Sequence, residues 1–260
     1  MRAALKAVLV FLGILGFIAI LALARCFFIF IPRKRAYCVS YMLYTFNKIL
    51  IRILGIRIEL TRQAQDLAYK GVFFVSNHFS YIDGIVAGSI FPFVFIGKSE
   101  LKTWPLLGVM IRLSETIFVN RANIFNIKSE LERARFLLNN NVNVILFPEG
   151  TSSDGKTVIP FKSSFFDAPL QSGSKIVPLT IKYKKINNKE VDESNKDLVY
   201  WYGDMDFFPH FFSLLGLKSI EVQLRVGQPL ETNHAEGQDS SVKRKYLSEL
   251  SQEVIRSQQG

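Results

Sequence analysis

His78 precedes Asp83 by five positions in this sequence. A carboxylate that accepts one ring N–H of a histidine fixes its tautomer and leaves the second nitrogen able to take a proton from a hydroxyl group. Five positions on a regular helix are about 140° apart, so the two side chains cannot meet on one helix. The spacing therefore predicts a general base if His78 lies in a loop and Asp83 in the first turn of the following helix.

A structural interpretation of the same residues stays open. Ser80 and Asp83 have the spacing of a capping box, in which Ser80 is the N-cap and Asp83 replaces the usual glutamate or glutamine. Asp83 would then only stabilise the start of its helix. The other two histidines, His210 in an aromatic run and His234 in a polar segment, are interpreted as incidental.

Apolar runs that can hold this pair in place alternate with helical segments from residue 56 onward. Strands are predicted at residues 56–60, 72–75, 93–96, 116–119, 142–147, 176–181 and 220–226, and helices at 80–90, 126–138 and 242–254. This alternation predicts an α/β fold with a mixed sheet flanked by helices. His78 follows the strand at 72–75, and open α/β sheets bind ligands in the loops at such strand ends. The polar segment 187–197 is predicted to be a loop.

Residues 1–55 are predicted to form one or two membrane-anchoring helices, and residues 56–260 the α/β domain. The run Ala7–Ala24 contains 18 residues without a charge, which is close to the roughly 20 that span a bilayer core. A cleaved signal peptide is the alternative, because Ala22-Leu23-Ala24 imitates a cleavage site. The apolar sequence continues to Pro32, which argues against cleavage.

Positive charge is heavier after this first apolar run than before it. Arg33, Lys34 and Arg35 follow the run, so the positive-inside rule places the main domain on the cytoplasmic side. The predicted location is a bacterial inner membrane. The segment Tyr41–Leu54 has a single polar stripe. It is predicted either to lie in the membrane surface or to be a core helix of the α/β domain.

The chain carries 32 lysines and arginines against 22 acidic residues, a formal charge of +10. Such a surplus indicates a partner with phosphate groups, either anionic lipid or nucleic acid. The 23 phenylalanines favour lipid, and the sequence has no pattern of a nucleic-acid-binding domain. Cys26 and Cys38 give neither a disulfide framework nor a metal-binding spacing, so no metal is expected.

Four blocks of the sequence occur in the order found in the 1-acylglycerol-3-phosphate acyltransferase family, which the chain resembles. The blocks are Asn77-His78-x-x-x-x-Asp83, Gly97-Lys98-Ser99-Glu100-Leu101 with Phe118-Val119-Asn120-Arg121, Phe147-Pro148-Glu149-Gly150-Thr151-Ser152-Ser153, and Ile176-Val177-Pro178-Leu179. They are similar to the family patterns N-H-x-x-x-x-D, K-x-E-L with F-[IV]-x-R, F-P-E-G-T-R-S and V-P-V. The resemblance covers about residues 77–181 and implies the fold of a glycerolipid acyltransferase.

The resemblance implies that His78 is the base and Asp83 its orienting partner. It also implies binding of the acceptor's glycerol and phosphate by Asn77, Lys98, Arg121, Glu149, Gly150 and Thr151. An arginine fork, a lysine charge and the backbone N–H groups of a glycine turn suit a phosphate. The implied reaction moves an acyl chain from acyl-CoA or acyl carrier protein (acyl-ACP) to the free hydroxyl of 1-acyl-sn-glycerol-3-phosphate and gives phosphatidate. No cofactor beyond this co-substrate is expected.

One position departs from the family pattern. Ser152 stands where the family has an arginine that is a candidate for phosphate binding, and Lys156 or Lys162 could supply the missing charge. The acceptor stays open between lysophosphatidate and lyso-ornithine lipid, because segment 151–155 resembles the lyso-ornithine branch equally well. The thioester carbonyl also needs an oxyanion donor, for which a backbone N–H near Gly150 is a candidate.

Other classes of protein fit the sequence less well. It has neither the G-x-S-x-G elbow of an α/β-hydrolase nor the G-x-x-x-x-G-K-[ST] loop of a nucleotide hydrolase. A membrane-anchored lipid-binding protein without activity shares the charge and the apolar N-terminus and stays an alternative. Such a protein does not need His78 and Asp83 at their spacing, so substituting His78 with alanine separates the two possibilities.

Overall fold

The computed structural model describes residues 1–62, 69–119, 127–232 and 239–259. The helices are α1 (Arg2–Phe27), α2 (Pro32–Leu54), α3 (Asp83–Gly88), α4 (Leu107–Leu113), α5 (Ile127–Asn139), α6 (Asp167–Ser172), α7 (Phe207–Gly216) and α8 (Ser240–Gln259). Short 3-10 helices are η1 (Ser99–Thr103), η3 (Ser164–Phe166) and η4 (Lys196–Leu198). The strands are β1 (Ile56–Arg62), β2 (Phe73–Ser76), β3 (Val94–Lys98), β4 (Ile117–Val119), β5 (Val144–Leu146), β6 (Ile176–Ile186), β7 (Lys189–Glu190) and β8 (Ile220–Val226).

These strands form one mixed sheet in the order β1-β8-β6-β2-β5-β3-β4, with β7 paired to β6. From β6 to β4 along this order each strand is parallel to the next, and β1 is parallel to β8. The pairs of β6 with β8 and with β7 are antiparallel. The α/β fold with a mixed, helix-flanked sheet is therefore confirmed.

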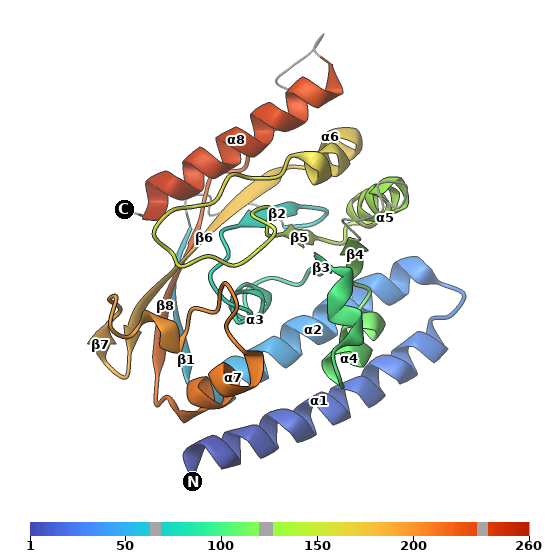
Figure 1. Ribbon diagram of the computed structural model, residues 1–260. Helices are drawn as coiled ribbons and strands as arrows, with labels where there is room; N and C mark the ends of the chain where they lie inside the picture. The colour runs from blue at the N-terminus through green and yellow to red at the C-terminus, as the bar shows by residue number, and fades with distance from the viewer. Residues whose placement is uncertain (63–68, 120–126, 233–238, 260) are drawn as a thin grey trace.

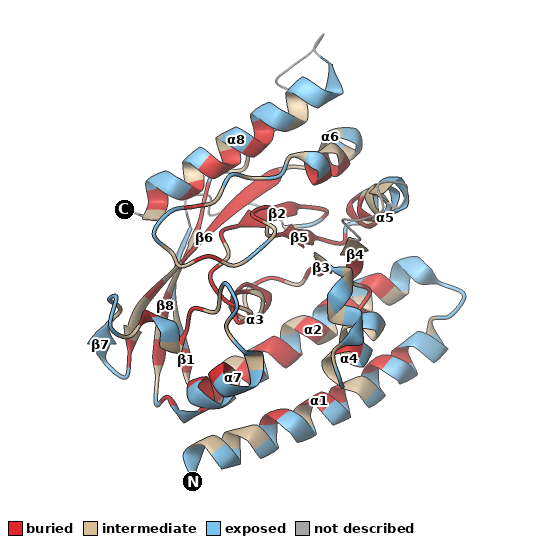
Figure 2. Cartoon of the chain, in the orientation of Figure 1, coloured by how far each residue is buried: buried red, intermediate tan, exposed pale blue. Residues whose placement is uncertain are grey.

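Helices cover both faces of the sheet (Figure 1). One face carries α1, α2, α3, α4 and α7, and the other carries α5, α6 and α8. Alternate residues of β2 point to opposite faces, so Phe74 belongs to the core of the first face and Phe73 and Val75 to that of the second. Figure 2 shows the buried residues concentrated in the sheet and on the helix sides turned toward it.

Several elements differ from their predicted length, and two of them bear on the site. The predicted helix at 80–90 begins only at Asp83, because the Asp83 carboxylate accepts the backbone N–H groups of Phe79 and Ser80 and holds these residues in a loop. Strand β6 runs five residues beyond the predicted end to Ile186, because β8 pairs with this extension. The predicted loop at 187–197 contains β7 and η4.

The two N-terminal helices pack on each other and on the sheet domain. Phe17 of α1 stacks on Phe46 of α2, with 4.2 Å between ring centroids. The Lys6 ammonium donates to the carbonyl oxygens of Leu54 and Leu217, at 2.7 and 2.8 Å, where α2 and α7 end. A single buried cluster contains residues of α1, α2 and the sheet. The division of the chain after residue 55 stays a prediction.

In the described part of the chain, α1 is the one helix long and apolar enough, by length and composition, to cross a membrane. The large apolar side chains that it exposes are Leu5, Val8, Leu9, Phe11, Leu12, Leu15, Ile20, Leu23 and Phe27. Helix α2 buries one face in the core that it shares with α1 and the sheet, as the core-helix interpretation requires.

Candidate active site

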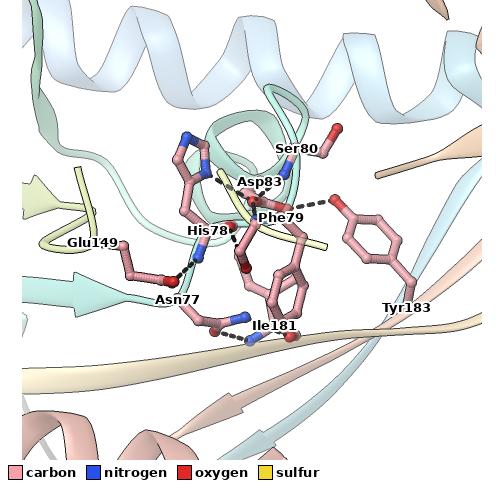
Figure 3. Close-up of polar contacts among 9 residues, drawn as sticks. Asn77, His78, Phe79, Ser80, Asp83, Glu149, Ile181 and Tyr183 are labelled. Atoms are coloured by element: carbon pink, nitrogen blue, oxygen red, sulfur yellow. Dashed lines mark hydrogen bonds and ion pairs between the residues drawn. The ribbon is translucent and has the colours of Figure 1, made fainter. Parts of the chain in front are cut away.

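The predicted contact between His78 and Asp83 is present at the end of β2 (Figure 3). Strand β2 ends at Ser76, His78 lies in the loop that follows, and Asp83 is the first residue of α3. His78 Nδ1 lies 2.9 Å from Asp83 Oδ2. The structure therefore contains the loop-and-first-turn geometry that the spacing requires.

Asp83 is completely buried and accepts four hydrogen bonds. Besides His78, its Oδ2 accepts the backbone N–H groups of Phe79 at 2.6 Å and Ser80 at 2.8 Å. Its Oδ1 accepts the hydroxyl of Tyr183 at 2.5 Å. A buried carboxylate needs such donors to remain ionised. These hydrogen bonds satisfy the Asp83 carboxylate and fix it beside the imidazole.

The capping interpretation is met in part. Asp83 accepts the Ser80 N–H, as the third helical residue of a capping box does. The reciprocal bond is missing, because Ser80 Oγ is buried without a hydrogen-bond partner among the described residues. The same carboxylate therefore shapes the loop and orients His78.

The imidazole of His78 is held on one side and open on the other. Its ring stacks on Phe147, with centroids 4.4 Å apart, and its side chain is 24% exposed. Figure 3 shows Nδ1 turned to Asp83 and the second ring nitrogen, Nε2, turned away. No described residue makes a hydrogen bond to Nε2. This nitrogen is placed to accept a proton from a bound molecule.

Glu149 positions the His78 loop, and its implied role in substrate binding stays a prediction. It is 2% exposed. Its Oε1 accepts the backbone N–H of His78 at 2.7 Å, and its Oε2 accepts that of Ile159 at 2.9 Å. Burial raises the pKa of Glu149 to about 7, against the lowering effect of these two bonds. Both oxygens are occupied, so the carboxylate joins two loops.

Asn77 also positions the loop, and its implied role in substrate binding stays a prediction. The residue is completely buried. Its side-chain amide donates to the carbonyl oxygen of Ile181 at 2.9 Å and accepts the Ile181 N–H at 2.8 Å. The amide therefore continues the pairing of β2 with β6 by one more residue.

The segment from Phe147 to Ser153 forms the wall of the site next to His78. Gly150 has a φ of 73°, a left-handed conformation that suits glycine. Its N–H donates to the carbonyl oxygen of Phe147 at 3.0 Å and is therefore engaged in the turn, while the predicted oxyanion donor near Gly150 stays a prediction. Thr151 is exposed, and the Ser153 N–H donates to the carbonyl oxygen of His78 at 2.9 Å.

The predicted cationic residues differ in exposure and in partners, and one of them is not described. Lys98 ends β3 and Lys162 follows the Phe147–Ser153 segment, and both are exposed. Lys156 is exposed and lies 3.6 Å from the Asp154 carboxylate. Arg121 is outside the described residues. Among the residues that are described, no group of three or more His, Cys, Asp or Glu could hold a metal ion.

The sequence did not indicate Tyr183 or the segment that precedes α7. Tyr183 is a β6 residue, and a tyrosine within a strand is typical of a packed core. In the segment before α7, the Trp201 N–H donates to the carbonyl oxygen of Phe79 at 2.9 Å, and Tyr200 stacks on the Phe79 ring. His210 lies on α7, where its Nδ1 is 2.9 Å from the hydroxyl of Tyr81, while His234 is outside the described residues.

Comparison with known proteins gives related acyltransferases. The model of the family described as Acyltransferase matches residues 56–182. A lyso-ornithine lipid O-acyltransferase of Brucella abortus (strain 2308) is 32% identical over 193 residues, which cover 71% of each chain. A 1-acyl-sn-glycerol-3-phosphate acyltransferase of Neisseria gonorrhoeae is 27% identical over 171 residues, covering 66% of this chain and 64% of that one.

A solved structure shares the fold. The crystal structure of the 1-acyl-sn-glycerophosphate (LPA) acyltransferase PlsC from Thermotoga maritima superposes with a TM-score of 0.58 at 20% identity. The match covers 97% of both chains. The likeness therefore includes the N-terminal helices as well as the sheet.

Proposed function

Because this chain belongs to the acyltransferase family of the 1-acyl-sn-glycerol-3-phosphate and lyso-ornithine lipid acyltransferases, we propose that it acylates 1-acyl-sn-glycerol-3-phosphate. The reaction takes a fatty acyl chain from acyl-CoA or acyl-ACP and gives phosphatidate. One observation carries the chemistry, namely the His78 imidazole bound to Asp83 through Nδ1 and open at Nε2.

The mechanism follows from this geometry. The hydroxyl of the acceptor gives its proton to His78 Nε2 while its oxygen attacks the carbonyl carbon of the thioester. Asp83 stabilises the imidazolium that forms, since its charge lies 2.9 Å from Nδ1. The tetrahedral intermediate then breaks its C–S bond, and the leaving thiolate takes the proton from His78. Atoms and charges balance without a protein nucleophile.

The surrounding residues support this assignment. A general base must keep its position while substrates enter and leave. The His78 loop is fixed at three points. Glu149 accepts the His78 N–H, and the Ser153 N–H donates to the His78 carbonyl oxygen. The side chain of the preceding residue, Asn77, binds Ile181 of β6. Lys98, in the second sequence block, and Lys162, which follows the third block, are exposed and suit an anionic acceptor.

Lyso-ornithine lipid is the second candidate acceptor. Ser152 replaces the arginine of the phosphate-binding block, and lyso-ornithine lipid O-acyltransferases of Brucella abortus and Rhizobium meliloti are 32% and 29% identical to this chain. The chemistry at His78 is the same for both acceptors, because each offers a hydroxyl group. The difference lies in the headgroup that the cationic side chains meet.

The proposed location is a membrane, with the active domain on the cytoplasmic face of a bacterial inner membrane. Helix α1 is apolar enough to enter a bilayer, and both acceptors are membrane lipids. The formal charge of +10 suits an anionic lipid surface.

The test is a matrix of acyl transfer by detergent-solubilised protein. Acyl-CoA and acyl-ACP are each offered with lysophosphatidate and with lyso-ornithine lipid, beside the His78→Ala variant. Turnover on lysophosphatidate that the variant lacks supports the proposal. Turnover on lyso-ornithine lipid alone assigns the second candidate. Lipid binding without turnover on any pair would favour a non-enzymatic membrane protein.

A further inference from the structure

Tyr183 makes the one hydrogen bond to the far oxygen of Asp83 within the described part of the chain. Its hydroxyl donates to Oδ1 at 2.5 Å, whereas His78 and the two backbone N–H groups bind Oδ2. Figure 3 shows the phenol of Tyr183 reaching Asp83 from the side opposite His78. The residues therefore form a chain in the order Tyr183, Asp83, His78.

The sheet places this hydroxyl. Strands β2 and β6 are parallel with Ser76 opposite Leu179, and the Asn77 amide fixes Ile181 beside the loop. Tyr183 is two residues further along β6, so it shares the face of Leu179 and Ile181, and all three belong to the core on the α3 side. The β6 register thus brings the Tyr183 hydroxyl to Asp83, the first residue of α3.

The Tyr183 hydroxyl can act only as a donor to Asp83. The residue is 3% exposed, and burial, together with the nearby Asp83 charge, raises the pKa of Tyr183 well above its ordinary value. A phenol that keeps its proton does not accept the imidazole proton, so Asp83 is the partner of that proton. It donates to the carboxylate in every protonation state of His78.

We propose that Tyr183 is a positioning residue of the acyl transfer reaction, acting through Asp83 on the basicity of His78. This inference rests on the proposed function. The Tyr183 bond is strongest when Asp83 carries its full charge beside a neutral imidazole, and weaker when an imidazolium already compensates that charge. The bond therefore favours the neutral form of His78, which is the form that accepts a proton.

A purely structural role would require only the ring. The Tyr183 ring packs with its centroid 5.4 Å from that of Tyr200, and phenylalanine would keep this packing. The hydroxyl is the part that reaches Asp83. The change Tyr183→Phe therefore separates the two roles.

The matched control is Tyr200→Phe. This variant removes the same atom from the neighbouring tyrosine, and no hydrogen bond joins the Tyr200 hydroxyl to Asp83 among the described residues. Wild type, both variants, His78→Ala and the double variant His78→Ala/Tyr183→Phe are assayed for kcat, KM and the pH dependence of kcat. Thermal unfolding in the same detergent reports whether each variant is folded.

The expected result for Tyr183→Phe is a kcat lower by about 10- to 100-fold, because Asp83 loses the bond that fixes its far oxygen and then orients His78 less well for proton transfer. The acid limb of its pH profile should move to higher pH, while KM stays within about twofold, a change too small to indicate a lost substrate contact. In the His78→Ala background the same change should have little further effect, because residues that act as a unit are not additive.

Two results would overturn the inference. One is a kcat and a pH profile of Tyr183→Phe equal to those of Tyr200→Phe. The other is a lower kcat that comes with a lower unfolding temperature and an unchanged pH profile. Failure of the proposed function is distinct, since wild type and His78→Ala would then have the same activity.

Discussion

At the residue scale, Asp83 and Glu149 are two buried carboxyl groups with different surroundings. Asp83 accepts four hydrogen bonds, including those from the His78 ring and the Tyr183 hydroxyl. Glu149 accepts two, both from backbone N–H groups, and burial raises its pKa to about 7. Glu149 is therefore expected to lose its proton near neutral pH. The same carboxyl group holds the His78 loop.

We expect Glu149 to make the folded protein less stable as the pH rises. Its pKa is about 7 in the folded state against an ordinary value of 4.5, so folding retains a proton that the unfolded chain releases between these values. The stability from this proton is complete below about pH 4.5 and is lost as the pH rises through about 7.

The Glu149→Gln variant serves as the comparison, because glutamine does not titrate. Unfolding midpoints in denaturant are measured for both proteins across this pH range. The advantage of wild type over the variant should shrink as the pH rises. Midpoints that change in parallel would show that Glu149 has the same protonation in the folded and unfolded states.

The sequence predicted the dyad but not the residues that hold it. His78 and Asp83 are close in the chain and follow a strand, so local spacing is sufficient. Tyr183 lies 100 positions from Asp83, and only the β2 to β6 register brings the two together. The positioning contacts of Asn77 and Glu149 were not predicted, because spacing does not reveal which distant backbone groups their side chains meet.

At the element scale, the site depends on the turn that leads into β2. Gly71 has a φ of 66°, and a Cβ added there would lie 2.5 Å from the carbonyl oxygen of Leu138, near the end of α5. The backbone atoms of Leu138 and Asn141 that lie near this position leave little room for an added side chain. Gly173, after α6, has the same φ of 66° but no atom within 4 Å of an added Cβ.

Gly71→Ala and Gly173→Ala are expected to differ in stability for this reason. Both variants place a side chain in a left-handed conformation, which costs about 1–2 kcal/mol. Gly71→Ala adds the contact with Leu138 and should be the less stable of the two. Unfolding in denaturant measures both free energies, and equal losses would mean that the Leu138 carbonyl moves away without cost.

Element boundaries show where sequence patterns stop being informative. The alternation in β8 predicted its bounds without error, because its side chains alternate between core and surface. The start of α3 was predicted three residues too early, because the amides that would begin the helix bind Asp83 instead. Helix α7 was not predicted, since its aromatic run has no polar stripe to indicate a helical period.

At the scale of the whole molecule, the N-terminal helices and the sheet share one core. The buried cluster on the α3 side includes Phe17 and Leu21 of α1, Phe46 of α2 and Phe74 of β2. A helix that only anchored the protein would contribute few side chains to such a cluster. One side of α1 therefore contributes to the shared core, and the other side exposes large apolar side chains.

Phe17→Ala is expected to destabilise the whole protein, whereas Phe11→Ala is not. Phe17 is 5% exposed and stacks on Phe46, so its loss should cost about 3–5 kcal/mol. Phe11 is 54% exposed on the same helix, and its loss should cost about 0.5 kcal/mol or less. Thermal inactivation in one detergent compares them. Similar midpoints for both variants would show that α1 is not part of the cooperative core.

The most direct test of the account is the rate of acyl transfer by His78→Ala on the acceptor that wild type uses, with His210→Gln as the control for losing a buried histidine. We predict that His78→Ala stays folded and membrane-bound and loses about 10²- to 10⁴-fold in rate, while His210→Gln keeps most of its activity. A His78→Ala enzyme that retains more than about a tenth of the wild-type rate would contradict the assignment of His78 as the general base.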